Sequence, residues 1–449
     1  MRLTAGQLRA LRHAVRGAVL APGDGGYDRA RVVFNRRFDG VRPPAVVRVR
    51  DAADVRAVVQ WARRHDVALV ARSGGHAYNG ASTSNDAVVV DVGRLNHVRL
   101  DDYGVATIGP GARNIDVYEA LARRGATVPS GSCPMVGAGG LVTGGGMGLA
   151  GRALGLALDR VTSFDVVTAD GRLRRVDARH NADLFWALRG GGGSFAIVTA
   201  MRLRARRVTS AAWFFASFPR SSAGEALAAW DHLAPGAPRA LTSIFTVPGG
   251  SGNVTALGQY LGSESALRRL VAPLTRVRGA RLRAGTSGYL ALQRRWAGCA
   301  DGGLAACHGD QRSLFAGSSV YVSERLSAAA RADFLSAART GATLILDAYG
   351  GAINEVAPDA TAFVHRHARF SVQILSYAGD VATARARVAR ARSRVAPHGN
   401  GQAYQNYADP SLSGAAHAYY GANYARLQRV KTATDPDHRF RPKQGVRAS

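Results

Sequence analysis

Two glycine-bearing turns, each with one nucleophilic side chain, constrain this chain more than any other feature of its sequence. The first is Arg72-Ser73-Gly74-Gly75-His76, which directly follows the apolar run 67–71. The second is Pro129-Ser130-Gly131-Ser132-Cys133-Pro134. Glycine lets the backbone adopt tight turns and come close to a ligand, and turn amides favour bound phosphate. We therefore expect both segments to lie against a flat, phosphate-bearing ligand.

Length predicts two or three domains, and hydropathy predicts no membrane-spanning segment. Its 449 residues are enough for more than one core. No run of eighteen apolar residues occurs, so we expect no membrane-spanning helix. Residues 1–21 lack the continuous apolar stretch of a signal peptide. These features predict a cytoplasmic location and no membrane partner, with secretion as the alternative if a signal was trimmed.

The formal net charge of +28 comes almost entirely from arginine, because Lys431 and Lys443 are the only lysines. A basic chain is a candidate for nucleic-acid binding. Here the arginines are spread along the whole length, alternate with alanine and accompany no recognisable binding module. We therefore expect no specific nucleic-acid partner. A non-catalytic polyanion-binding protein is kept as an alternative.

Three cysteines are too few for a disulfide framework. Cys299 and Cys307 are either a local disulfide or two buried thiols, and the sequence leaves both open. No second pair of ligands accompanies them, so no metal site is predicted.

The periodicity changes once along the chain. Up to about residue 206 short strands and helices alternate, including a helix over 51–66 opened by Asp51 and a helix over 114–123 capped by Asn114. Asp170-Gly171 predicts a hairpin between two strands. From about 210 to 394 long strands alternate with helices, which indicates an antiparallel sheet with helices on one face. A final helix is expected over 419–434.

The segment 146–151 matches the G-x-G-x-x-G pattern of dinucleotide-binding folds. That pattern needs an apolar strand immediately before it. Here a glycine-rich stretch, 137–145, precedes it instead. We therefore interpret the region as a loop whose backbone amides lie along a cofactor.

Several motifs together resemble the berberine bridge enzyme-like branch of the FAD-linked oxidases, which has the vanillyl-alcohol-oxidase, or PCMH, type of FAD domain. The resemblance covers residues 27 to 447. Besides the two turns, it rests on the segments Gly131–Gly140, Asp165–Gly171, Leu184–Gly193 with Phe195, Tyr404–Asp409 and Tyr420–Tyr424.

The resemblance implies an α+β fold with two main parts. Residues 1–206 would form the PCMH-type FAD-binding domain. Residues 207–394 would form a substrate domain, with an antiparallel sheet covered by helices. Residues 395–449 would be a berberine bridge enzyme-like segment that returns to the FAD domain.

The resemblance also implies covalently bound FAD, with His76 attached to the 8α-methyl and Cys133 to C6 of the flavin. A neutral imidazole and a thiolate are suitable nucleophiles for these carbons. For either residue alone, a satisfied turn histidine or a buried thiol is the alternative. The other implied cofactor-binding residues are Arg72, Ser73, Gly74, Gly75, Gly131, Val136, Gly137, Gly139, Gly140, Gly144, Gly145, Val198, Tyr404, Asn406 and Tyr407.

Three residues are candidates for catalysis. Tyr407 matches the family's catalytic base, and its phenol, with a pKa near 10, would have to be shifted down to act. Tyr349 either supplies a hydrogen bond to the site or packs in a strand. Gln373 aligns by context with a catalytic glutamate of some members. Glutamine is no base, and this departure favours the alcohol oxidases that use a tyrosine.

The implied reaction takes a hydride from a hydroxyl-bearing carbon of an alcohol, a sugar or a secondary metabolite to flavin N5. O2 would then reoxidise the flavin and give H2O2, and Val136 matches the family's oxygen-permissive type. The expected partners are a small-molecule substrate and O2. A dehydrogenase of the same fold with another electron acceptor is the alternative. The oligomeric state stays open.

Overall fold

The structure is a computed structural model that describes residues 1–309 and 311–449. Its strands form three main sheets and one two-stranded pair, β11-β7. The strands are β1 Ala18–Leu20, β2 Val46–Arg48, β3 Leu69–Arg72, β4 Val88–Asp91, β5 Val98–Leu100, β6 Val105–Ile108, β7 Ala126–Thr127, β8 Val161–Thr168, β9 Leu173–Asp177, β10 Ala196–Arg204, β11 Arg206–Arg207, β12 Ser210–Phe218, β13 Leu241–Val247, β14 Val254–Tyr260, β15 Arg281–Gly288, β16 Ala316–Val322, β17 Thr343–Ala348 and β18 Phe370–Ser376.

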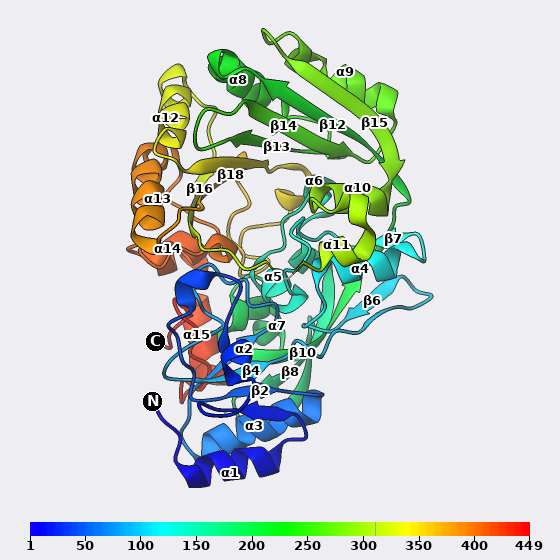
Figure 1. Cartoon of the computed structure of the whole chain (residues 1–449). Coiled ribbons are helices and arrows are strands. Elements are labelled where there is room, and N and C mark those ends of the chain that lie inside the picture. The colour runs from blue at the N-terminus through cyan, green and yellow to red at the C-terminus, as the bar shows by residue number, and fades with distance from the viewer. Residues whose placement is uncertain (310) are drawn as a thin grey trace.

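The α-helices lie between and around these sheets (Figure 1). They are α1 Ala5–Ala14, α2 Tyr27–Arg31, α3 Ala52–Arg64, α4 Asn114–Ala122, α5 Ala138–Gly144, α6 Gly151–Leu154, α7 Ala182–Leu188, α8 Ala223–Leu233, α9 Glu264–Thr275, α10 Tyr289–Trp296, α11 Gly303–Cys307, α12 Ala328–Ala338, α13 Val381–Val395, α14 Ala415–Tyr420 and α15 Tyr424–Thr434. The predicted α+β class is confirmed.

The N-terminal unit contains two sheets. The first has the order β1-β2-β4-β3, with β4 parallel to both β2 and β3. The second has the order β5-β6-β10-β8-β9. α3 forms where predicted: the Asp51 side chain accepts hydrogen bonds from the amides of Ala53 and Asp54, and the helix buries a valine-rich face. The predicted hairpin joins β8 to β9 through Gly171, whose φ is +76°.

The third sheet is antiparallel, with the order β15-β12-β14-β13-β17-β18-β16. Alternate side chains of a strand face opposite sides of a sheet. In β17, Leu344 and Leu346 enter the core beneath the covering helices, whereas Ile345 and Asp347 line a cavity on the other side. Figure 1 shows α8, α9, α12 and α13 outside this sheet, which confirms the predicted helices on one face.

The C-terminal residues return to the N-terminal unit. The amide of Leu69 in β3 donates to the Arg439 carbonyl at 2.8 Å, and the amide of Arg441 donates to the Leu69 carbonyl at 3.0 Å. The domain boundaries near 206 and 394 stay predictions.

Two local predictions are corrected. Asn114 is the first residue of α4 rather than its cap, because its side-chain amide donates to the Cys133 carbonyl instead. The helix expected over 419–434 is interrupted, because Gly421 has a φ of +48° and ends α14 before α15 begins. The structure also decides an open question: Cys299 and Cys307 form a disulfide.

Within the described residues, no helix is long and apolar enough to cross a membrane. Nor do the described histidine, cysteine and acidic side chains form a group of three suited to a metal ion.

Arg152 of α6 connects the N-terminal unit to residues 234–241, in the unit that contains the third sheet. Its side chain is buried, and its guanidinium donates at 2.7–3.0 Å to the carbonyls of Ala234, Pro235, Ala237 and Leu241. Burial lowers the pKa of Arg152 to about 10, so it remains a cation at neutral pH.

We expect Arg152→Met to lower the free energy of unfolding by about 3 kcal/mol, because it leaves buried carbonyls without donors. Denaturant unfolding of the purified protein measures this. The control is Arg268→Met, which removes an exposed pair with Glu264 and should cost less than about 1 kcal/mol. Equal effects of the two substitutions would contradict the expectation.

Candidate active site

A cavity of about 960 Å³ lies between the N-terminal unit and the open face of the third sheet. The predicted site residues that line it are Ser73, Gly74, Gly75, His76, Gly131, Cys133, Val136, Gly137, Gly139, Gly140, Gly144, Val198, Gln373, Tyr404, Asn406 and Tyr407. Residues from five separate parts of the sequence therefore meet in one cavity.

The first glycine-bearing turn touches the backbone that directly follows the second. A Cβ added to Gly74 would lie 2.4 Å from the Gly137 nitrogen, and one added to Gly137 would lie 2.3 Å from the Gly74 nitrogen. Only residues without side chains allow this approach. The contact brings the His76 turn and the loop that contains Cys133 close together in the cavity lining.

His76 is held as a neutral imidazole. Its ring stacks on Phe34 with a centroid distance of 4.1 Å. Burial, with a smaller contribution from the Arg113 cation, lowers the pKa of His76 to about 4. The imidazole is therefore unprotonated at neutral pH, the form that a nucleophilic histidine needs.

Cys133 is exposed to the cavity, and its carbonyl accepts a hydrogen bond from Asn114 Nδ2 at 3.0 Å. The surrounding protein raises the pKa of the thiol through burial, and the charge of Asp347 adds to this effect. The thiolate considered in the sequence analysis is therefore not the resting form at neutral pH in this environment. Attachment through Cys133 requires its proton to leave first.

The cavity fits FAD. Its volume is at the upper end of the range of small-molecule sites. Gly140, Gly192 and Gly193 line it, and a Cβ at each would meet no atom of the described chain within 4 Å. Bare backbone therefore faces the space where a ligand comes close. His76 and Cys133 supply the two nucleophiles that a doubly attached flavin requires.

Tyr407 faces this cavity from the C-terminal segment. Its ring stacks on Tyr78 at 5.6 Å and meets the edge of Tyr404 at 4.8 Å. The Tyr404 hydroxyl is fixed by hydrogen bonds from the Gly146 amide at 2.9 Å and from Asn406 Nδ2 at 3.0 Å. Gln373 donates to the Tyr78 hydroxyl. The site therefore combines two nucleophiles with a cluster of phenols.

Comparison with known proteins identifies the family. Models of an FAD binding domain and of berberine and berberine-like proteins match residues 43–177 and 403–447. The chain is 32% identical to the uncharacterized FAD-linked oxidoreductase YvdP of Bacillus subtilis over 447 residues, which is 96% of this chain and 98% of that protein. The chain belongs to the berberine bridge enzyme-like FAD-linked oxidoreductases. It is an FAD-dependent enzyme, and the resemblance seen in its motifs is confirmed.

Solved structures of this oxidoreductase family share the fold. Physcomitrella patens BBE-like 1 superposes with a TM-score of 0.94 at 28% identity, and 99% of each chain is covered. The glucooligosaccharide oxidase of Acremonium strictum superposes with a TM-score of 0.88 at 26% identity, also over 99% of each chain. That oxidase is described with a 6-S-cysteinyl, 8α-N1-histidyl FAD.

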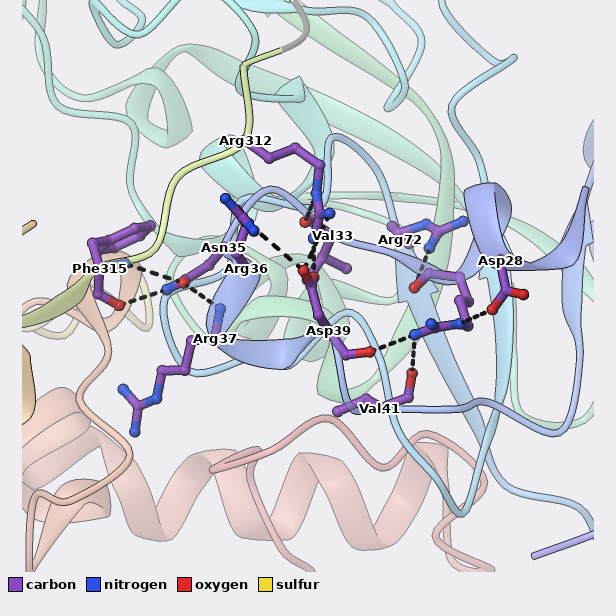
Figure 2. Close-up of polar contacts among 11 residues, drawn as sticks. Asp28, Val33, Asn35, Arg36, Arg37, Asp39, Val41, Arg72, Arg312 and Phe315 are labelled. Carbon is purple, nitrogen blue, oxygen red and sulfur yellow. Dashed lines mark hydrogen bonds and ion pairs between the residues drawn. The ribbon is translucent and has the colours of Figure 1, made fainter. Parts of the chain in front are cut away.

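Three predicted site residues of this oxidoreductase lie behind the lining. Arg72 fixes the first turn, because its guanidinium donates to the Ala30 carbonyl at 2.6 Å and to Asp91 at 2.8 Å. Figure 2 shows a further hydrogen bond, from Arg72 to the Arg31 carbonyl. Gly145 makes room for Tyr404, whose hydroxyl would lie 2.4 Å from an added Cβ. The Tyr349 hydroxyl bonds to that of Tyr321 at 2.9 Å, in a buried aromatic cluster.

The predicted downward shift of the Tyr407 phenol is corrected. Burial raises its pKa well above the usual value, and the nearby Asp347 and phenols add to the rise. The described site thus stabilises the neutral phenol.

Asp347 is the functional candidate that sequence analysis missed. It is buried, lines the cavity from β17 and accepts a hydrogen bond from Ser371 at 3.3 Å. Burial raises the pKa of Asp347 to about 7. The available signal was one acidic residue inside an otherwise uncharged strand, on the same side as Ile345.

Proposed function

We propose that this protein is an FAD-dependent oxidase of a hydroxyl-bearing small molecule: an alcohol, a sugar or a hydroxylated secondary metabolite. The observation that carries the proposal is the single cavity that joins His76 and Cys133 to Tyr407 and Asp347. The similarity to a glucooligosaccharide oxidase supports a sugar among these classes.

Bound FAD would supply the hydride acceptor, N5, and would return to its oxidised form as O2 becomes H2O2. His76 would hold the flavin at its 8α-methyl and Cys133 at C6. Both side chains line the cavity, so two bonds would fix the orientation of the ring relative to the third sheet. Such fixed positioning of reactants is a large source of rate enhancement.

Tyr407 and Asp347 would remove the proton of the substrate hydroxyl. The carboxyl of Asp347 is the more acidic of the two, with a pKa of about 7, whereas burial keeps the phenol neutral. We propose that the substrate proton passes to the Tyr407 oxygen while the phenol's own proton passes toward the Asp347 carboxylate. This keeps an unpaired phenolate from accumulating in a buried site.

The experiment that tests the function uses the purified holoenzyme and a panel of alcohols, monosaccharides and oligosaccharides. We expect at least one to drive O2 consumption, with one H2O2 formed per O2 consumed. Substrate that reduces the flavin without H2O2 formation in air would instead favour the dehydrogenase. A colourless protein would refute the proposal and favour the polyanion-binding alternative.

Asp347→Asn should remove a pH dependence. In the unchanged enzyme the rate of flavin reduction by substrate should rise with pH through about 7, because the proton acceptor must first lose its own proton. In Asp347→Asn the rate should fall by about 10²-fold or more and should not change with pH across this window. Stopped-flow absorbance under argon measures both. The control is Asp333→Asn, which alters a surface contact with His398. An unchanged pH profile in Asp347→Asn would contradict the assignment.

A further inference from the structure

A disulfide-closed loop from the third sheet's unit forms one wall of the cavity. We call residues 297–309 the disulfide loop. It follows α10, contains the Cys299–Cys307 disulfide, and places Ala297, Ala306, Cys307 and Gly309 against the cavity. Residues 311–315, called the clasp, lead on to β16, and Gln311 and Phe315 also line the cavity.

The disulfide loop is fastened beside Cys133. Both of its cysteines pack on Ile115 of α4, and His308 Nε2 lies 2.7 Å from Asp116 Oδ1 of the same helix. The first turn of α4 also holds the second glycine-bearing loop, since the amide of Ile115 donates to the Pro134 carbonyl at 3.1 Å. The first turn of α4 therefore contacts both the disulfide loop and the loop that contains Cys133.

The clasp is fastened beside His76. Arg312 donates to the Val33 carbonyl at 2.8 Å and pairs with Asp39, as Figure 2 shows. The Asn35 side chain donates to the Phe315 carbonyl at 2.9 Å and accepts from its amide at 3.3 Å. The residue between these contacts, Phe34, stacks on the His76 ring. The clasp is therefore fastened to the segment 33–39, whose Phe34 packs on His76.

The disulfide loop and the clasp together form one wall, which is fastened near Cys133 at one end and near His76 at the other. The inference rests on the proposed attachment of the flavin to these two side chains. The 8α-methyl and C6 belong to the benzenoid part of the ring, so this edge would face the wall. We propose that the disulfide loop and the clasp select the electron acceptor, by covering the benzenoid edge against bulky acceptors. O2 is small enough to reach the flavin past a packed wall. The enzyme would therefore act as an oxidase for a steric reason.

The disulfide is needed for this role because, besides the His308 contact with Asp116, much of the loop is exposed. Residues 300, 301, 305 and 306 are exposed, and α11 spans only five residues. The buried contact of the loop is the sulfur pair against Ile115, with Ala297 and Leu304 beside it. Cross-linking limits the conformations of such a segment.

The test compares two acceptors in the holoenzyme. The flavin is reduced under argon with one equivalent of dithionite and then mixed with O2 or with 2,6-dichlorophenolindophenol. In the dye reaction two electrons and one proton leave the reduced flavin, and the dye takes them up with one proton from solvent and loses its colour. The variants are Cys299→Ala/Cys307→Ala and Arg312→Gln. The matched control is Arg220→Gln, which removes surface contacts to the Pro248 and Gly252 carbonyls.

We expect both wall variants to raise the rate of the dye reaction about tenfold or more, while the O2 rate changes less than about twofold. The control should match the unchanged enzyme. Hydrogen exchange of residues 297–309 reports independently whether the wall has loosened, and Arg312→Gln serves if the cysteine variant does not fold. Faster exchange with an unchanged dye rate would overturn the proposal, as would equal increases for both acceptors.

The failure of the inference and that of the proposed function are separable. If the denatured, unchanged protein releases its flavin, the attachment fails and the placement of the wall fails with it. If the flavin stays attached and H2O2 forms, but the wall variants show no acceptor preference, only the inference is wrong.

Discussion

Replacing Tyr407 with phenylalanine is expected to slow reduction of the flavin by substrate about 10²- to 10⁴-fold. The substitution removes one oxygen and keeps the ring, which stacks on Tyr78 and meets the edge of Tyr404. Packing and flavin attachment should therefore persist, and the loss should be confined to proton removal. Anaerobic stopped-flow bleaching of the flavin at saturating substrate measures the step. Reoxidation by O2 should be nearly unchanged, since no substrate proton moves in that step.

The control for this substitution is Tyr321→Phe. Tyr321 is also a buried phenol, and its hydroxyl bonds to that of Tyr349 behind the cavity. Its loss should lower stability modestly and leave the rate of flavin reduction within a few-fold of normal. If Tyr407→Phe instead reduces its flavin as fast as the unchanged enzyme, the phenol only packs. The role of proton acceptor would then fall to Asp347 alone.

The second large effect concerns attachment. His76→Ala should leave the flavin held by Cys133, and Cys133→Ala should leave it held by His76. The double variant should lose all covalent flavin. In the double variant the glycine backbone around Gly140 and Gly193 still faces the cavity, so FAD should bind reversibly. Absorbance of the acid-precipitated pellet and of the supernatant measures the two pools.

The two single variants need not behave alike. His76 is already neutral, with a pKa of about 4, whereas burial raises the pKa of the Cys133 thiol. We therefore expect Cys133→Ala, in which only the histidine bond forms, to be fully flavinylated at pH 7. His76→Ala should reach full attachment more slowly at pH 7 than at pH 9, where more of the thiol is ionised. The reverse order would contradict this account of the two nucleophiles.

Local signals in the sequence were sufficient for much of the fold. Asp51 marks the start of α3, and Asp170-Gly171 marks the β8–β9 hairpin, because both depend on neighbours in the chain. The prediction for Asn114 was wrong because it depends on a residue that is distant in the sequence. Its residue type suits a cap, but its partner, the Cys133 carbonyl, is brought close only by the tertiary fold.

The candidate site also has features that the sequence predicts and features that only the tertiary fold determines. The two turns, Tyr404 and Tyr407 were predictable because glycine and family motifs mark them in the sequence. The pKa of Tyr407 was not, since its burial and the nearby charge of Asp347 arise only in the folded protein. Tyr349 and Asp347 stand two residues apart. Which of them faces the cavity depends on where β17 ends. The strand ends at Ala348, so Asp347 lies within it and lines the cavity, whereas Tyr349 lies beyond it and behind the lining.

Peptide mapping of the unchanged holoenzyme tests the central claim most directly. After proteolysis and mass spectrometry, the account predicts one flavin-bearing species in which the peptide containing His76 and the peptide containing Cys133 are both joined to a single FAD. Flavin recovered free, or on peptides that lack both residues, would contradict the account of the site.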